Sequence, residues 1–302
     1  MTDPYRSTHL VDGPAGRIAV VDHGGDGPDV LLLHGAGRTL LDWEALRPHL
    51  TGLRLVAMDL RGHGRSDPPP DGGYGWTGHL ADVDAVVSAL GLRRPWLVGH
   101  SLGGMVAVRR AATRAGCRGV VDLDGFGGGV PSLYPGLGAE EVTARRAEQL
   151  ALYSGGAAAP IGVAECAAQA RTRARLLGWD GGIEAAGALR ALSEDGYARP
   201  AAAELGALMA PLEGWDMFAE VRGLNCPVLL VRGARPPELG HLPLRIRELT
   251  ESLIRGITRE LASVGGDGRG PVRVAELADA GHMLHLERPA AVGGLLRAFL
   301  GA

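Results

Sequence analysis

The chain has 302 residues, of which 46% are hydrophobic, and its formal net charge at pH 7 is −3. That length allows one large core or a core with an inserted segment. All 31 basic residues are arginines spread among acidic ones, so we expect a small-molecule substrate and no nucleic-acid partner. The absence of lysine excludes a pyridoxal phosphate Schiff base and a P-loop lysine, and we expect no cofactor.

The cysteines and the amino terminus indicate a cytoplasmic protein. Cys117, Cys166 and Cys226 are few and widely spaced, which predicts neither a disulfide framework nor a CxxC metal pair. The first residues lack the basic and apolar regions of a signal peptide, and no apolar run reaches about 18 residues, so we expect no membrane span. The exclusive use of arginine and the abundance of alanine and glycine favour a GC-rich bacterial genome.

Strand and helix patterns alternate in the first half of the chain. Short β-branched and leucine-rich runs predict strands at 17–24, 29–35, 53–60, 94–100 and 119–125. Helical spacing predicts helices at 79–92 and 102–116. This alternation is typical of an α/β fold with a mostly parallel sheet and helices on both faces, in which ligands bind at the carboxyl ends of the strands.

From about residue 131 to 214 the alternation stops. Alanine-rich helical patterns at 139–153, 163–178 and 183–196 predict a helical cap over 131–214, inserted into a core formed by 1–130 and 215–302. The glycines of 125–129 predict a mobile hinge into this cap.

The core pattern resumes after the predicted cap. Strand patterns at 226–233 and 270–278 enclose a helical run at 243–264, and a last helix is expected at 290–300.

The sequence "GHSLG" at 99–103 follows one of these strands and precedes a helix. Glycines on either side of Ser101 allow a sharp turn that holds the serine out at the sheet edge. The helix begins directly after it, so the Leu102 amide can donate to an oxyanion. The context favours a nucleophile over an ordinary turn residue.

A nucleophilic serine needs a base, and His282 lies in a loop between the last predicted strand and the last helix. His100 and His285 are more typical of packing or supporting residues. A metal pair of His282 and His285 is the other interpretation, but no HExxH pattern or acid at ligand spacing accompanies it, so we expect no metal.

Together these motifs resemble those of α/β-hydrolase-fold proteins with a serine nucleophile and a helical cap. The resemblance rests on "LLLHGAG" (31–37), "MDLRGHGRSD" (58–67), "VGHSLGG" (98–104), "NCPVLLVRG" (225–233) and "DAGHMLHLERP" (279–289). It implies an eight-stranded sheet, a second oxyanion amide from Ala36 and a loop shaped by His34. Arg61 and Asp67 are then structural residues.

The position of the catalytic acid departs from the family pattern. Relatives usually place it three residues after the glycine that corresponds to Gly233, where this chain has Pro236. A minority, including haloalkane dehalogenases, carry it after the preceding strand, which implies Asp124 here. The alternatives are Glu238 and the absence of an acid. An aspartate nucleophile, which the dehalogenase and epoxide-hydrolase chemistries of this fold require, is excluded by Ser101.

The aromatic residues near the predicted cap indicate an apolar entrance. Phe126, Tyr134, Trp179, Trp215 and Phe218 either pack in the core or line the substrate site, and His34, Gly35 and His100 are further candidates for substrate contact. We expect hydrolysis of an ester, thioester or lactone of a small to medium apolar compound by Ser101, His282 and Asp124. The alternatives are a cofactor-independent lyase, cyclase or acyltransferase of specialised metabolism, and a ligand-binding protein without turnover.

Overall fold

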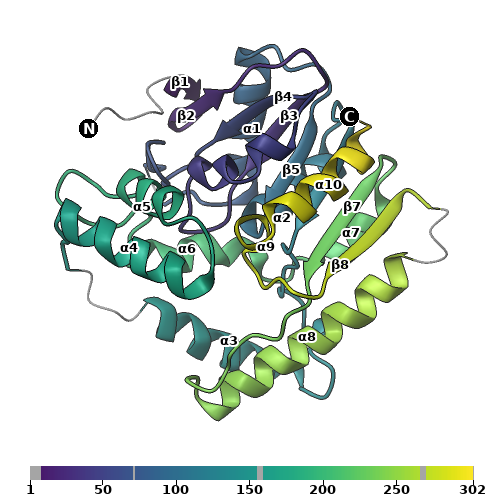
Figure 1. Ribbon diagram of the computed structural model, residues 1–302. Helices are drawn as coiled ribbons and strands as arrows, with labels where there is room; N and C mark the ends of the chain where they lie inside the picture. Colours follow the sequence, from purple (N-terminus) through teal and green to yellow (C-terminus); the bar gives the residue numbers. More distant parts are fainter. Residues whose placement is uncertain (1–7, 71, 155–158, 266–269, 302) are drawn as a thin grey trace.

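The computed structural model describes residues 8–70, 72–154, 159–265 and 270–301, and shows an eight-stranded sheet with helices on both faces (Figure 1). The strand order is β1-β2-β4-β3-β5-β6-β7-β8. β2 pairs antiparallel with β1 and β4, and all other neighbours are parallel. The predicted α/β class with a mostly parallel sheet is confirmed.

The elements have the following bounds. The strands are β1 (Thr8–Gly13), β2 (Gly16–Asp22), β3 (Asp29–Leu33), β4 (Arg54–Met58), β5 (Trp96–His100), β6 (Gly119–Leu123), β7 (Val228–Gly233) and β8 (Val272–Leu277). The α-helices are α1 (Trp76–Ala89), α2 (Leu102–Thr113), α3 (Ala139–Ser154), α4 (Val163–Leu177), α5 (Gly181–Arg190), α6 (Leu205–Met209), α7 (Met217–Gly223), α8 (Leu244–Gly265), α9 (Leu284–Glu287) and α10 (Pro289–Leu300). The short 3₁₀ helices are η1 (Leu40–Glu44), η2 (Arg47–His49), η3 (Pro131–Leu133), η4 (Ala202–Glu204) and η5 (Ala210–Leu212).

The central strands are apolar throughout because both faces of the sheet are covered. In β3, Leu31 and Leu33 face a core completed by residues of α1, α2, α7 and α8. Val30 and Leu32 face a second core completed by residues of η1 and α10. This alternation orients the parallel strands so that their carboxyl ends share one edge, where the loops carrying the candidate site residues emerge.

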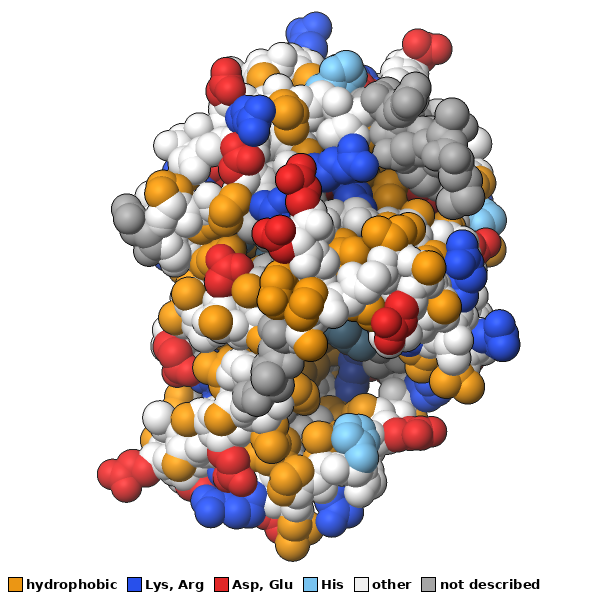
Figure 2. Space-filling model, turned by 90° about the vertical axis from the view of Figure 1, so that its left-hand side faces the viewer, with side chains coloured by type: hydrophobic (Ala, Val, Ile, Leu, Met, Phe, Trp, Pro, Cys, Tyr) orange, Lys and Arg blue, Asp and Glu red, His pale blue; other side chains and the backbone are white. Residues whose placement is uncertain are grey.

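The segment 131–214 is helical in its described part, residues 131–154 and 159–214, where the one strand-like feature is an isolated bridge between Leu192 and Ala198. α4 packs against α5, α5 against η1, and α3 against α8. In Figure 1, α4, α5 and α6 lie to one side of the sheet, and α3 and α8 lie below it. Figure 2, which views the molecule from the side of α4 and α5, shows a hollow that is bordered by hydrophobic side chains and has a histidine and a basic side chain inside it.

Two features of the structure add to the sequence predictions. β1 was not predicted, because it is an edge strand with one buried residue, Val11, and so lacks an apolar alternation. At 125–129, where a mobile hinge is predicted, a Cβ on Gly129 would overlap the Leu212 carbonyl oxygen, and one on Gly128 would meet the Tyr134 hydroxyl oxygen at 2.5 Å. Close approach is thus one reason for glycine here, and the mobility of the hinge stays a prediction.

Candidate active site

Ser101 lies at a sharp turn between β5 and α2. Its φ of 50° and ψ of −119° place it in a strained region for a residue with a side chain. A Cβ on Gly103 would overlap the Leu33 carbonyl, and one on Gly99 would overlap the Gly103 backbone. The two glycines therefore let the strand, the helix and β3 approach closely while Ser101 is held at the turn.

Two backbone segments border Ser101 where an oxyanion could bind. Leu102 is the first residue of α2, so its amide belongs to the helix N-terminus, where N–H groups lack intrahelical partners. On the other side, a Cβ on Gly35 would lie 3.2 Å from the Ser101 Cβ, so the loop after β3 packs directly on the serine. Ala36, the second predicted oxyanion residue, follows in this loop and is half-buried.

His282 and Asp124 meet across 158 positions of sequence. The His282 Nδ1 lies 2.8 Å from Asp124 Oδ2, and the other oxygen, Oδ1, accepts from the Gly233 amide at 3.1 Å. The carboxylate is 16% exposed and the imidazole 55%. Glu238 is exposed and forms no hydrogen bond or ion pair with the described residues. The geometry therefore favours Asp124 over Glu238 as the residue that orients the imidazole.

His100, the residue before Ser101, contacts His282. The His100 Nε2–H donates to the His282 carbonyl oxygen at 2.9 Å, and the two rings lie 4.7 Å apart between centroids. Within the described residues the Ser101 hydroxyl makes no hydrogen bond to His282. Such catalytic hydrogen bonds commonly tighten only when substrate binds.

A second carboxyl group, Asp122, lies two residues before Asp124 in β6 and is fully buried. A Cβ on Gly104 or Gly125 would collide with its carboxyl oxygens, so it fills the space behind the serine turn. Burial, together with the nearby Asp124 carboxylate, raises the pKa of Asp122 well above its ordinary value. Burial thus disfavours the charged form of Asp122, and its carboxyl group packs behind the turn.

His34, Gly35 and His100, the predicted substrate contacts, are all buried, and contact with substrate stays a prediction for them. His34 Nδ1–H donates to the Gly35 carbonyl at 2.7 Å, while its Nε2 accepts from the Leu60 amide at 2.9 Å. Burial lowers the His34 pKa to about 4, so the ring is neutral at pH 7 and supports the loop from behind.

The aromatic candidates are also mainly packing residues. Phe126 stacks on Phe218 with centroids 6.0 Å apart, and Trp215 packs on Trp76 at 4.6 Å. Both Phe126 and Trp215 are buried. Trp179 is half-buried, and its indole N–H donates to Glu184 at 3.2 Å. Their aromatic character alone could not distinguish packing from substrate contact.

Sequence reasoning missed the residues that hold the His282 loop. The buried Glu287 carboxylate accepts from the Gly281 amide at 2.9 Å and from Arg235 at 2.5 Å. The Arg235 amide donates to the Ala280 carbonyl at 2.9 Å. Arg235 lies beside Pro236, where the resemblance implied that the acid would stand, so this loop contributes a cation that supports the His282 loop instead.

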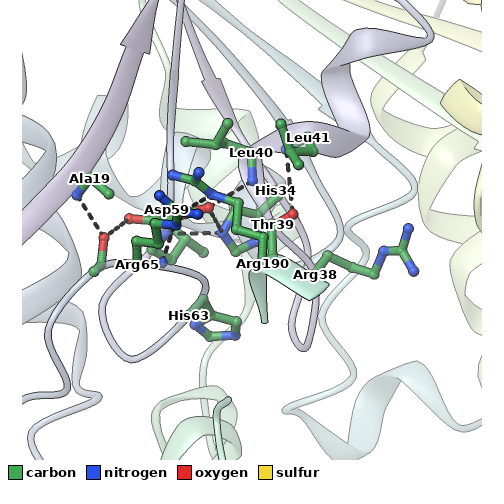
Figure 3. Close-up of polar contacts among 12 residues, drawn as sticks. Ala19, His34, Arg38, Thr39, Leu40, Leu41, Asp59, His63, Arg65 and Arg190 are labelled. Carbon is green, nitrogen blue, oxygen red and sulfur yellow. Dashed lines mark hydrogen bonds and ion pairs between the residues drawn. The ribbon is translucent and has the colours of Figure 1, made fainter. Parts of the chain in front are cut away.

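A buried polar group centred on Asp59 supports the other side of the site (Figure 3). Its carboxylate accepts from the Leu40 amide at 2.8 Å, from the Arg65 amide at 2.9 Å and from Arg190 Nε at 2.8 Å. Asp59 follows β4, whereas Arg190 ends α5. This group fixes the start of η1 and ties α5 to the sheet.

Two absences hold for the part of the chain that the structure describes. None of its helices combines the length and the apolar character needed to cross a bilayer. It also contains no group of three or more histidine, cysteine, aspartate or glutamate side chains arranged to hold a metal ion.

The sequence profile of the alpha/beta hydrolase family matches residues 30–294. The chain belongs to this family. The chain is 37% identical over 99 residues to protein phosphatase methylesterase 1 of Mus musculus, covering 31% of this chain and 26% of that protein. It is 33% identical over 119 residues to 2-succinyl-6-hydroxy-2,4-cyclohexadiene-1-carboxylate synthase of Salmonella agona, covering 39% of this chain and 44% of that protein. The matched part of this α/β hydrolase thus covers 26% of the length of the first relative and 44% of the length of the second.

Solved structures agree with the fold over nearly the whole chain. The crystal structure of E-2-(acetamidomethylene)succinate hydrolase superimposes with a TM-score of 0.69 at 23% identity, covering 98% of this α/β hydrolase and 99% of the other chain. At this identity the likeness concerns the fold and not the substrate. The family model and this structural similarity confirm the predicted superfamily.

Proposed function

We propose that this α/β hydrolase cleaves an ester, thioester or lactone through an acyl-enzyme on Ser101, with His282 as base and Asp124 as the residue that orients it. The observation that supports this most directly is the 2.8 Å contact between His282 Nδ1 and Asp124 Oδ2. With its proton on Nδ1 and donated to the carboxylate, the imidazole has a free lone pair on Nε2.

In the proposed mechanism, the Ser101 oxygen attacks the substrate carbonyl carbon while its proton passes to His282 Nε2. The Leu102 and Ala36 amides donate to the oxygen that becomes negative. The bond to the alcohol or thiol then breaks, and His282 returns the proton to the departing group. Water, deprotonated by the same imidazole, attacks the acyl-enzyme and regenerates Ser101 with release of the acid.

We further propose that segment 131–214 acts as a cap that selects a small to medium apolar acyl group. The packing of α5 against η1 supports this, because η1 follows directly on the loop that carries Ala36. The hollow bordered by hydrophobic side chains in Figure 2 also supports an apolar substrate.

A second candidate is a cofactor-independent, non-hydrolytic reaction on the same residues. Its support is the 33% identity over 119 residues to the Salmonella agona synthase. In that case the same serine and histidine would still form the reactive pair, but water would not complete the turnover.

A fluorophosphonate probe and a series of p-nitrophenyl esters distinguish these functions. Labelling of the wild type together with steady turnover supports hydrolysis, and Ser101→Ala should abolish both while leaving the circular dichroism spectrum unchanged. Labelling without ester turnover favours the non-hydrolytic candidate. Absence of labelling in a folded wild type would rule out Ser101 as a nucleophile.

A further inference from the structure

A buried carboxylate on α5, Glu184, connects the helical segment to the loop beside Ser101. Its side chain is fully buried and binds three partners from different places. Arg38 donates to both of its oxygens, at 3.1 and 2.8 Å. On the α4 side, Arg173 Nε donates at 2.9 Å and the Trp179 indole at 3.2 Å. Glu184 therefore joins α4, the α4–α5 connection and the Arg38 loop at one point.

Arg38 is held equally firmly on its other side by Asp42 of η1. Arg38 Nε and Nη2 donate to the two oxygens of that carboxylate at 2.8 and 2.7 Å. Burial opposes the charge on Arg38, but the Asp42 and Glu184 carboxylates outweigh it and raise the Arg38 pKa. A planar guanidinium that binds two carboxylates in two-point fashion is fixed in orientation as well as position.

The loop that Arg38 anchors is the one that carries the Ala36 amide. The Arg38 amide donates to the Gly35 carbonyl at 3.2 Å, which closes the turn around Ala36 and Gly37. Gly37 has a φ of 69°, and no atom lies within 4 Å of where its Cβ would be. The turn is therefore open at Gly37, although Ala36 packs against the core, and the polar contacts of Arg38 constrain the residue that directly follows Gly37.

We propose that Glu184, acting through Arg38, is a positioning residue that sets the place of the Ala36 amide in the oxyanion hole. This inference rests on the proposed function for its catalytic consequence. Oxyanion donors stabilise the transition state only when they are held in place before the reaction. Loss of the Glu184–Arg38 contact therefore lowers kcat, whereas ground-state binding of the acyl group, which does not use this amide, changes little.

An arginine that binds two carboxylates at the opposite edge of the sheet provides a matched control. Arg54, the first residue of β4, donates to Asp22 at 2.8 Å and to Asp29 at 3.3 Å. This cluster lies at the amino ends of the parallel strands, whereas Ser101 follows the carboxyl end of β5. Arg54→Gln therefore removes a comparable set of ion pairs but leaves the Arg38 contacts in place, so it reports on stability without the proposed positioning effect.

The experiment compares Glu184→Gln, Arg38→Gln, the double variant and Arg54→Gln. For each we measure kcat and KM on p-nitrophenyl butyrate and amide hydrogen exchange of a peptide covering residues 34–40. We expect kcat of both single variants to fall about 10- to 100-fold with KM within about threefold, and exchange of the peptide to accelerate. The double variant should resemble Arg38→Gln, because Arg38→Gln alone already removes the Glu184–Arg38 contact. Arg54→Gln should lower the melting temperature but keep kcat within about twofold and leave the peptide's exchange unchanged.

Two results would overturn the inference: unchanged exchange at 34–40 in Glu184→Gln and Arg38→Gln, or an equal loss of kcat in Arg54→Gln. Failure of the proposed function gives a different pattern. In that case the wild type is neither labelled by the fluorophosphonate probe nor active on esters, and the exchange measurement alone decides whether Glu184 positions the turn.

Discussion

Replacing Asp124 by asparagine removes the negative charge that orients His282 with little change of shape. In the wild type, Asp124 Oδ1 accepts from the Gly233 amide and Oδ2 faces His282 Nδ1 at 2.8 Å. An asparagine that keeps the first contact presents its NH₂ group to Nδ1, which forces the imidazole proton onto Nε2. That tautomer cannot accept the Ser101 proton. We expect kcat to fall roughly 10⁴-fold, equivalent to about 5 kcal/mol of barrier.

The assay is steady-state hydrolysis of p-nitrophenyl butyrate at pH 8, with circular dichroism to verify folding. Glu238→Gln is the matched control, because Glu238 is an exposed acid in the loop where relatives carry theirs. It should retain wild-type activity. Activity of Asp124→Asn within tenfold of the wild type, or a large loss in Glu238→Gln, would refute the assignment of the acid.

Three further predictions concern the scaffold. Asp82→Ala leaves the buried Arg61 guanidinium without the carboxylate that binds it at 2.7 and 2.9 Å, and urea unfolding should show a loss of about 3–5 kcal/mol. Burial is the largest cause that lowers the His79 pKa to about 3, and the Arg61 charge is the second. Below pH 6.5 the unfolded chain therefore binds a proton at His79 that the native state does not bind. Stability therefore falls as pH falls, and His79→Leu should reduce the loss between pH 7 and 5 by about 2 kcal/mol. Gly129→Ala forces a Cβ onto the Leu212 carbonyl and should lower thermal stability by about 1–3 kcal/mol, whereas a loose hinge would tolerate it.

The sequence predicted the parts of the molecule that have a local signal. Buried parallel strands such as β3 are continuous apolar runs, and the glycines around Ser101 mark its turn, so the sheet and the serine could be located. The contact between Arg38 and Glu184 has no such signal. The two residues are 146 positions apart, and each by itself is an ordinary charged residue of a loop or a helix. Only the packing of α5 against η1 brings them together.

The register of the sheet explains how the proposed acid, Asp124, can lie after β6 instead of after β7. Ser101 follows β5 and His282 follows β8, so an acid that reaches the imidazole can come from either strand between them, β6 or β7. These two are parallel neighbours, with Leu123 opposite Val231, and their ends therefore reach the same level of the sheet. The Asp124 amide donates to the Val231 carbonyl at 2.8 Å, and the Asp124 carboxylate accepts from the Gly233 amide. The end of β7 therefore fixes the position of Asp124, although Asp124 itself follows β6. Because the proposed acid comes from the end of β6, the loop after β7 does not need to supply one. This loop contains Arg235, which supports the His282 loop through Glu287.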